Sequence, residues 1–185
     1  STCPWDILAA YQGGMIGSIG GSNRYMALTE VMQEIGGKHF VGGNLNQNYS
    51  RTRTGGKNDL VFNFGLNIND GVFLGLNVGV PFSRYNSSEF YSEVPVNKDD
   101  FVVAFLSDDG KSLIETKFLA GEYQYRYASN VTGIYAKLGA IILPMPGLRI
   151  GLAIQSPTMY TIRENWQISC RSYLEDTNYN MSHSS

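Results

Sequence analysis

The sequence predicts a mainly β protein: an antiparallel meander of about five to six strands from an outer-membrane β-barrel, preceded by a short helical segment. Three observations predict this class. Apolar residues alternate with polar residues or glycine over successive stretches. The chain holds 21 Gly and 12 Tyr, and only 16% of its 185 residues are charged. Short connections alternate with long ones, as the turns and loops of such barrels do.

Composition and charge exclude several other classes. A net charge of −2 lacks the basic footprint of a nucleic-acid-binding protein. No run approaches the roughly 18 apolar residues of a transmembrane helix. The chain begins Ser1-Thr2-Cys3, without an initiator Met or the regions of a signal peptide. We therefore expect either that a signal was removed or that the chain is a segment of a longer protein. Cys3 and Cys170 could form a disulfide or remain two thiols.

Residues 1–37 differ from the rest and are expected to be helical and loop-like. Apolar side chains from Trp5 to Tyr11 have helical spacing, and residues 27–35 read as a short amphipathic helix ended by two glycines. The Gly-rich run 13–21 between them suggests a loop. It follows no strand and lacks the Gly-Lys-Ser/Thr ending of a phosphate loop, so we expect no nucleotide site there.

From residue 38 the period changes to two, and residues 38–170 are expected to form the barrel segment. A polar strand is expected at 39–52. In 60–68 apolar residues alternate with Asn63, Gly65 and Asn67. Asn69-Asp70-Gly71 predicts a tight hairpin, because such residues accept the positive φ of a primed turn. The next strand, 72–82, repeats the alternation and carries Asn77 between two glycines on its polar face.

The second half is expected to contain three further clear strands. A long connection, 83–115, with a short strand at 101–106, leads to strands at 118–128, 133–143 and 148–155. Residues 144–147 predict a short turn, and a long connection is expected after 155. Ser156-Pro157-Thr158 interrupts the ladder, because proline cannot donate a backbone hydrogen bond. A strand is expected to resume over 159–169, before a polar, frayed tail at 171–185.

The alternation has two interpretations. The simpler interpretation is a soluble antiparallel sheet with one face exposed to solvent. The barrel is favoured because the faces opposite the apolar ones are rich in Gly and Asn and carry single charges. The candidate lumen-facing residues are Asn63, Asn67, Asn77, Glu122, Gln124, Arg126, Lys137 and Arg149.

Two groups of candidate residues, five of the lumen-facing ones and the three at the strand break, each have competing explanations. Glu122, Gln124 and Arg126 could form a ladder with Lys137 and Arg149 on neighbouring strands. Such a ladder would line a transport lumen or simply satisfy charges inside the barrel. Ser156, Pro157 and Thr158 mark either a lateral gap in the wall or the start of a loop.

Three blocks carry a resemblance to a known family. Gly133-Ile134-Tyr135-Ala136-Lys137-Leu138-Gly139-Ala140, then Pro144-Met145-Pro146-Gly147-Leu148-Arg149-Ile150-Gly151, then Ser156-Pro157-Thr158-Met159-Tyr160, resemble the FadL family of outer-membrane transporters, including its Bacteroides-like members. Residues 63–85 are similar to the preceding hairpin of that family. The resemblance spans residues 60–165. Members of the family begin with an N-terminal hatch, which plugs the lumen and carries an Asn-Pro-Ala signature, and this chain lacks that signature. The resemblance therefore implies an internal segment of a Gram-negative outer-membrane barrel.

The resemblance implies passive transport of long-chain fatty acids or other hydrophobic small molecules, with no cofactor, no metal and no enzymatic step. The expected partners are outer-membrane lipid and a hydrophobic ligand, with self-association through open sheet edges and no nucleic acid. Ligand-binding residues are not carried over, because the hatch is missing. A soluble or surface-exposed β-rich interaction module is the alternative function. His39 and His183 lie near no carboxylate at a catalytic spacing, so we expect no enzyme.

Overall fold

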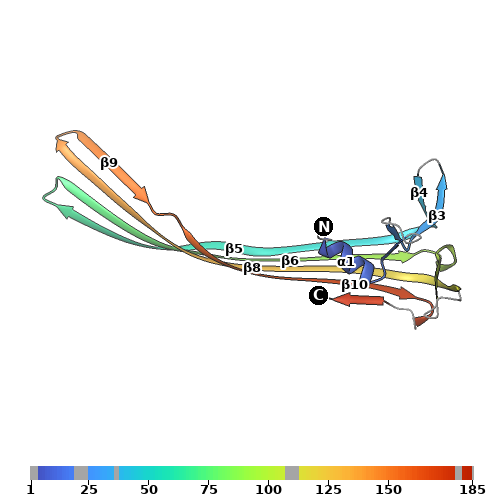
Figure 1. The fold of residues 1–185 in the computed structure, drawn as a ribbon. Coiled ribbons are helices and arrows are strands. Elements are labelled where there is room, and N and C mark those ends of the chain that lie inside the picture. The colour runs from blue at the N-terminus through green and yellow to red at the C-terminus, as the bar shows by residue number, and fades with distance from the viewer. Residues whose placement is uncertain (1–3, 19–24, 36–37, 107–112, 178–180, 185) are drawn as a thin grey trace. The chain divides into compact units, whose positions relative to one another are not determined.

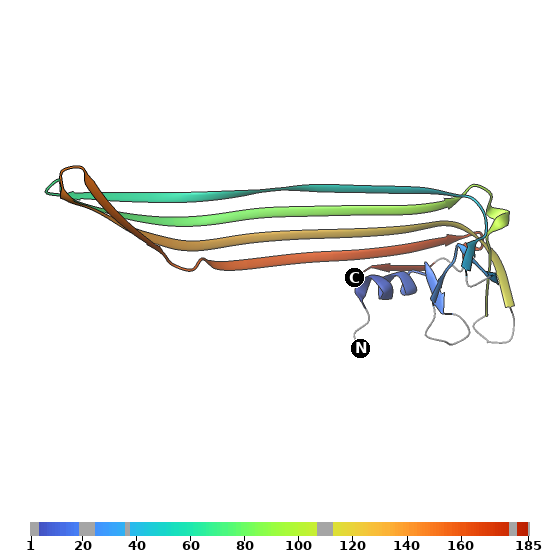
Figure 2. The same ribbon diagram turned by 90° about the horizontal axis from the view of Figure 1, so that it is seen from above.

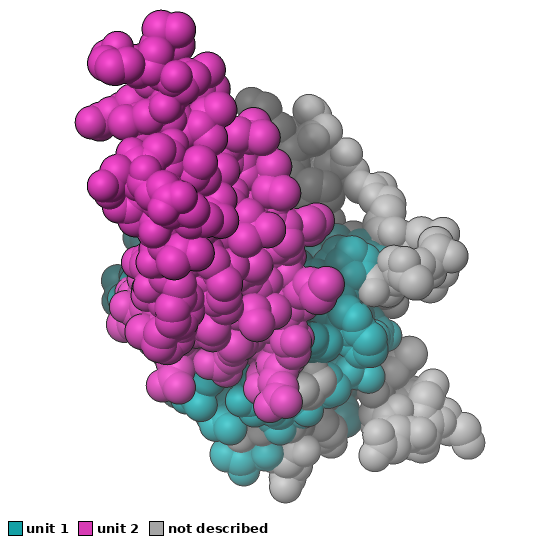
Figure 3. All heavy atoms as spheres, turned by 90° about the vertical axis from the view of Figure 1, so that its left-hand side faces the viewer, with its two compact units in different colours: residues 1–52, 87–126, 166–185 teal, residues 53–86, 127–165 magenta. Residues whose placement is uncertain are grey.

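The computed structural model describes residues 4–18, 25–35, 38–106, 113–177 and 181–184. These residues are mainly β, with antiparallel strands and one short N-terminal helix, which confirms the predicted antiparallel β meander with a helical N-terminal segment (Figure 1). The sheet does not close on itself. The chain divides into two compact units (Figure 3). Unit 1 comprises residues 1–52, 87–126 and 166–185, and unit 2 comprises residues 53–86 and 127–165.

A single antiparallel sheet contains the longest strands. Its order is β11-β10-β8-β6-β5, with β7 and β9 also pairing with β8 (Figures 1 and 2). Because β5, β6, β8 and β10 contribute residues to both units, each unit holds only part of each strand. The bounds are β5 Leu45–Ile68, β6 Val72–Pro95, β7 Val102–Leu106, β8 Leu113–Met145, β9 Leu148–Gln155, β10 Met159–Leu174 and β11 Met181–Ser184.

Unit 2 contains two tight turns of the sheet. Asn69 and Asp70 both have positive φ, 50° and 53°, and the Gly71 N–H donates to the Ile68 carbonyl at 3.3 Å. This confirms the predicted primed hairpin between β5 and β6. The turn between β8 and β9 depends on Gly147, whose φ of 87° is a conformation that L residues rarely adopt. Beyond it, β9 pairs with β8, with Leu138 opposite Ile154 and Ile142 opposite Ile150.

Unit 1 contains the helix α1 (Trp5–Gln12), which confirms the helix predicted near the N-terminus. Ala9 of α1 is buried against Ile168 and Cys170 of β10, with Tyr123 and Tyr125 packed around them. After the helix, the Ser172 hydroxyl donates to the Gly13 carbonyl at 2.7 Å. The Gly-rich run 13–21, as far as it is described, therefore joins the helix to the sheet by close packing.

Unit 1 also contains a second buried cluster of Phe101, Phe118 and Leu174, against which Leu28, Leu45 and Val103 pack. The backbone N–H of Phe118 donates to the carbonyl of Phe101 at 2.9 Å, which joins the start of β8 to the segment before β7. The remaining elements are β1 (Ile16–Ser18) paired with β2 (Tyr25–Ala27), β3 (Glu30–Ile35) paired with β4 (Lys38–Val41), and the 3-10 turn η1 (Lys98–Asp100).

The helix predicted at 27–35 is wrong. Residues 25–27 belong to β2, and Glu30–Ile35 forms β3, which pairs with β4 through Val31 opposite Phe40 and Ile35 opposite Lys38. A pair of glycines after an apolar stretch ends a helix or reverses a hairpin equally well. Here pairing with residues 38–41 decided the outcome, since tertiary context overrides weak helix propensity.

Four predicted boundaries are also wrong. Residues 118–128 and 133–143 are one continuous strand, β8, and β6 continues through residues 83–95, where a long connection was expected. The long connection expected after 155 is only a three-residue break, 156–158, before β10. In the predicted tail, β10 continues to Leu174 and Met181–Ser184 forms β11, which pairs with residues 169–172 of β10. In each case hydrogen bonding to a neighbouring strand extends the strand through polar residues that read as loop.

Candidate functional site: the two faces of unit 2

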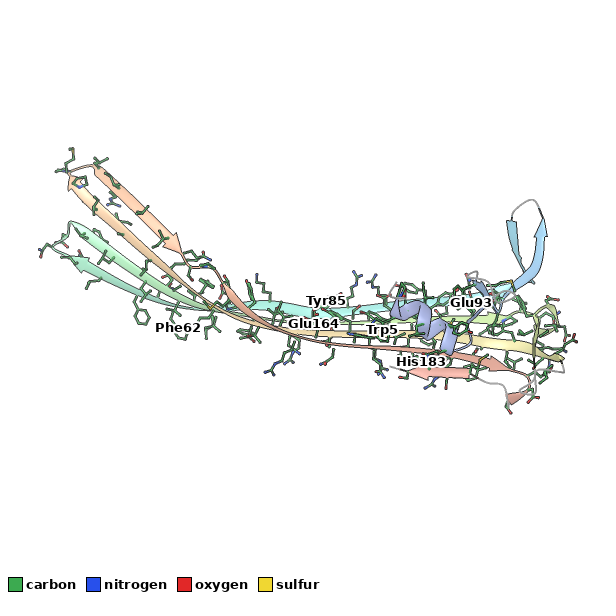
Figure 4. All side chains as sticks on the ribbon, viewed as in Figure 1. Trp5, Phe62, Tyr85, Glu93, Glu164 and His183 are labelled. Atoms are coloured by element: carbon green, nitrogen blue, oxygen red, sulfur yellow. The ribbon has the colours of Figure 1, made fainter. Side chains whose placement is uncertain are left out.

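One face of unit 2 is a continuous exposed apolar surface. Figure 4 shows Phe62 projecting away from the sheet; it is 51% exposed, and Leu152 on β9 is 74% exposed. The surface arises because alternate residues of each strand share a face. Its exposed members are Leu60, Phe62, Phe64, Leu66 and Ile68 on β5, Leu74, Leu76 and Phe82 on β6, Ile134, Leu138 and Ile142 on β8, and Leu148, Ile150, Leu152 and Ile154 on β9.

The opposite face of unit 2 carries a polar contact that spans three strands. The Tyr135 hydroxyl on β8 donates to Asp59 Oδ2 on β5 at 2.7 Å. To reach it, the Tyr135 ring lies over Gly79 of β6, where an added Cβ would be 2.1 Å from Tyr135 Cζ. The Lys137 ammonium lies 5.1 Å from the centroid of the same ring, a cation–π distance. Gly79 is therefore the residue that lets Tyr135 connect β8 to β5.

Glycines of three neighbouring strands line a shallow apolar groove of about 460 Å³. Gly75, Gly139 and Gly151 belong to β6, β8 and β9, and Phe73 and Ile141 also line the groove. An added Cβ at Gly75 would have the Gly139 carbonyl oxygen, 3.9 Å away, as its nearest neighbour, so the space above these glycines is open. Its lining residues carry no polar side chain, which favours an apolar ligand over a charged one.

A row of polar and aromatic side chains lies where the apolar alternation of the strands ends. Tyr127 of β8 donates its hydroxyl to the Glu164 carboxylate of β10, and its ring lies 6.0 Å from that of Tyr85 on β6. The Arg84 guanidinium donates to Asn130 Oδ1 at 3.2 Å. Figure 4 labels Tyr85 and Glu164 in this region. The row therefore ties β6, β8 and β10 together through side chains.

The predicted break at Ser156-Pro157-Thr158 is present, but its first residue stays bonded to the wall. The Ser156 N–H donates to the Ala136 carbonyl at 2.9 Å, and the Ser156 hydroxyl accepts from the Ala136 N–H at 3.0 Å. The same hydroxyl donates to the Pro157 carbonyl. The serine side chain therefore replaces a backbone acceptor that the break would otherwise remove from β8.

The structure separates the candidate lumen residues into two groups. Glu122, Gln124 and Arg126 belong to unit 1, whereas Asn63, Asn67, Asn77, Lys137 and Arg149 belong to unit 2. The predicted ladder between Glu122–Arg126 and Lys137 on a neighbouring strand is wrong, because both lie on β8. Glu122 instead accepts from the Tyr173 hydroxyl at 3.4 Å, and Asn67 donates to Asp70 in the hairpin.

In unit 1, β5 and β6 are joined by a polar row. Arg51 Nε lies 2.8 Å from Glu89 Oε1, and the Tyr49 hydroxyl also donates to Glu89. Gln47 donates to Tyr91 and Glu93, and Tyr91 donates to Glu93. Burial and the adjacent Glu93 raise the pKa of Tyr91. These groups are mutually satisfied, which favours a structural role.

A charged clasp, formed by Lys98, Asp99, Lys117 and Glu175, joins η1, β8 and the end of β10. Lys117 Nζ lies 2.6 Å from Asp99 Oδ1, and Lys98 Nζ lies 2.6 Å from Glu175 Oε1. The lysines lower the pKa of Asp99 and of Glu175, and Asp99 raises the pKa of Lys117. All four side chains are solvent-accessible, so the clasp is open to titration.

The described residues contain no candidate metal centre. Among them there is no group of three or more His, Cys, Asp or Glu side chains that could hold a metal ion. His39 lies in β4, and His183 of β11 is opposite Cys170 in the backbone pairing. Cys170 is a buried thiol, whose pKa burial raises to about 11. Cys3, for which a disulfide with Cys170 and a free thiol were both left open, lies outside the described residues.

The contacts of Asp59 and Glu164 were missed by the sequence reasoning. Asp59 precedes the clear apolar alternation, and Glu164 follows the strand break, so neither position was considered. The available signal was Gly79: a glycine within an otherwise regular strand often marks a close approach by another group. Tyr135 at the polar position of the next strand would have been the natural candidate.

In comparisons with known proteins, no protein-family model matches this chain, and no curated protein matches it. Among the described residues, no helix is long and apolar enough to cross a membrane.

Proposed function

We propose that this chain forms part of the wall of an outer-membrane β-barrel that transports long-chain fatty acids or other hydrophobic small molecules. The observation that carries the proposal is the exposed apolar face of unit 2. A continuous apolar surface on four adjacent strands is costly in water and favourable against lipid. The alternation leaves polar and glycine positions on the other face, as a barrel with a lumen requires.

The dimensions of this surface support the membrane assignment. On β5 it runs from Leu60 to Ile68, close to the roughly 9–11 residues with which a tilted strand crosses the hydrocarbon core. Tyr85, Tyr127 and Glu164 follow where it ends, and tyrosine is enriched at membrane–water interfaces. The tight turns at residues 69–71 and 146–147 correspond to the short periplasmic turns of such barrels.

The transport part of the proposal depends on the resemblance to the FadL family and on the apolar groove. A groove floored by Gly75, Gly139 and Gly151 accommodates an alkyl chain and offers no charged group to a polar solute. Transport by such a wall needs binding and diffusion only, without a covalent step.

Lipid accessibility tests the membrane assignment. Single cysteines replace Phe62, Phe64 and Leu152 on the apolar face, and Asn63 serves as the matched control on the other face of the same strand. Each variant also carries Cys3→Ser and a spin label, in vesicles. We expect the three apolar positions to be more accessible to oxygen than to a polar nickel reagent, and Asn63 to show the reverse. Equal profiles, or a monomer that stays soluble without detergent, would instead support the soluble interaction module.

Uptake of a fatty acid tests the transport assignment separately. Vesicles that contain the protein are mixed with oleate, and an internal fluorescent fatty-acid sensor reports its arrival. We expect faster uptake than in protein-free vesicles, and slower uptake when Gly139→Leu fills the groove. The matched control is Gly56→Leu, since an added Cβ at Gly56 meets no atom within 4 Å. Uptake equal to that of protein-free vesicles would reject transport but leave the wall intact.

A further inference from the structure

The two outer strands of unit 2 each have a neighbour on one side only, among the residues that the structure describes. In this unit β5 pairs with β6, and β9 pairs with β8. The outer side of each strand carries backbone N–H and C=O groups directed away from the sheet. If unit 2 lies in lipid, as proposed above, no water replaces the missing partners, so both edges require a strand.

The two edges run in opposite directions. Contacts of Gly71 with Leu143, Gly79 with Tyr135 and Arg84 with Asn130 show that residue numbers rise along β6 as they fall along β8, so these strands are antiparallel. With a tight hairpin on either side, β5 and β9 are therefore antiparallel as well. The Leu143 N–H donates to the Gly71 carbonyl at 2.8 Å, which sets the two tight turns side by side.

The apolar bands of the two edges also match. The exposed apolar residues of β5 end at Ile68, beside one turn, and those of β9 begin at Leu148, beside the other. When the turns are level, an apolar position on one edge faces an apolar position on the other, and Asn63 and Asn67 share the opposite face with Arg149. A slip of one residue would set apolar beside polar, so the register is specified.

We propose that copies of this chain pair edge to edge, with β5 of one copy against β9 and the start of β10 of a second. Two copies related by a two-fold axis satisfy both edges at once. The wall then has eight strands, four from each copy, which is the smallest number in single-chain bacterial barrels. This inference rests on the proposed function. Pairing of β5 with β5 is disfavoured, because it would place the tight turns on opposite sides of the membrane.

Disulfide mapping in vesicles tests the pairing. One tagged copy carries Phe64→Cys on β5, and a second copy with a different tag carries Ile150→Cys, Leu152→Cys or Ile154→Cys on β9. Both carry Cys3→Ser, and the buried Cys170 stays in place. The matched control replaces Leu74, an exposed apolar residue of the inner strand β6, with cysteine. After mild oxidation, the mixed-tag dimer is quantified on a non-reducing gel.

The expected result is a mixed dimer at one or two of the β9 positions, at least about tenfold more abundant than with Leu74→Cys, since a disulfide requires Cα atoms about 4.4–6.8 Å apart. Equal yields at all positions, a predominant dimer of the Phe64→Cys copy with itself, or no dimer would each overturn the pairing. The spin-label profile in the same vesicles keeps the two proposals distinct. A lipid-facing profile without a mixed dimer rejects the edge pairing and leaves the membrane wall in place.

Discussion

Units 1 and 2 share the strands β5, β6, β8 and β10 but place their apolar side chains in different surroundings. All the hydrophobic residues that are buried among the described ones, such as Phe101, Phe118 and Leu174, belong to unit 1. In unit 2 the corresponding aromatic and aliphatic side chains are exposed, Phe62 and Leu152 among them. Alternation along a strand therefore specifies an apolar and a polar face, but it does not specify whether other protein segments cover the apolar face.

The largest expected effect comes from replacing a phenylalanine in each unit. Phe118 is 2% exposed and packs on Phe101 and Leu174, so Phe118→Ala should lower the free energy of unfolding by about 3–5 kcal/mol. Phe62→Ala in unit 2 should lower the free energy of unfolding in detergent much less, because an exposed side chain leaves no cavity in the protein when it is removed. Urea unfolding followed by tryptophan fluorescence measures both. Equal losses for the two variants would contradict the contrast between the units.

A charge on the apolar face sharpens the same comparison in lipid. Phe64→Arg should destabilise the membrane-inserted protein by about 2–4 kcal/mol, because the arginine would face hydrocarbon. Asn63→Arg, the adjacent position on the opposite face, should cost far less. Urea titration in vesicles, with folded protein scored by altered gel mobility without heating, gives both values. If the two arginines cost the same, the assignment of the faces is wrong.

A methyl group at Gly79 tests the polar contact of unit 2. Gly79→Ala should destabilise the protein by about 1–3 kcal/mol, because its Cβ would overlap the Tyr135 ring and separate Tyr135 from Asp59. Gly75→Ala is the control, since its Cβ would meet only one atom, at 3.9 Å. In a double-mutant cycle, Tyr135→Ala should remove most of the cost of Gly79→Ala. Additive costs would show that the ring does not lie over residue 79.

The smallest expected effect is the acid sensitivity of the charged clasp in unit 1. The pKa values of Asp99 and Glu175 are lowered in the folded state. Their contribution is therefore present above the unfolded pKa values, near 4, and is lost as the pH falls through the folded ones. Lys117→Gln should make the fall in stability between about pH 5 and 3 shallower than in the unmodified chain. The midpoints of urea unfolding across this pH range provide the measurement. If the midpoints of both proteins fall equally with pH, the clasp does not contribute to the acid sensitivity.

Much of the fold could be predicted where a local rule acts alone. The Asn69-Asp70-Gly71 hairpin, the helix at the N-terminus, the strand 148–155 and the break at Pro157 were predicted from turn chemistry, spacing and the missing proline N–H. The predictions failed where a neighbouring strand decided the outcome. Residues 128–133 look like a turn because of Ser129 and Asn130, yet β8 continues through them, and Asn130 accepts a hydrogen bond from Arg84 of β6.

The candidate site shows the same division. The alternation that gives the strands of unit 2 an apolar and a polar face was predicted, because a period of two is a property of the extended chain. The contact between Tyr135 and Asp59 was not, since 76 residues separate them and only the order β5-β6-β8 brings them together. The ladder of Glu122, Gln124 and Arg126 with Lys137 failed because all four residues lie on one continuous strand, β8.

The sequence by itself determined that this protein is an antiparallel β structure whose strands each have an apolar and a polar face. That follows from alternation, glycine content and turn residues, all of which act within a few positions of the chain. Only the tertiary structure decided where strands continue through polar residues, that Gly79 makes room for Tyr135, and that Phe101, Phe118 and Leu174 of unit 1 are buried while Phe62 and Leu152 of unit 2 are exposed. These features depend on contacts between residues that are far apart in the chain, and the strength of such contacts cannot be predicted from a few neighbouring residues.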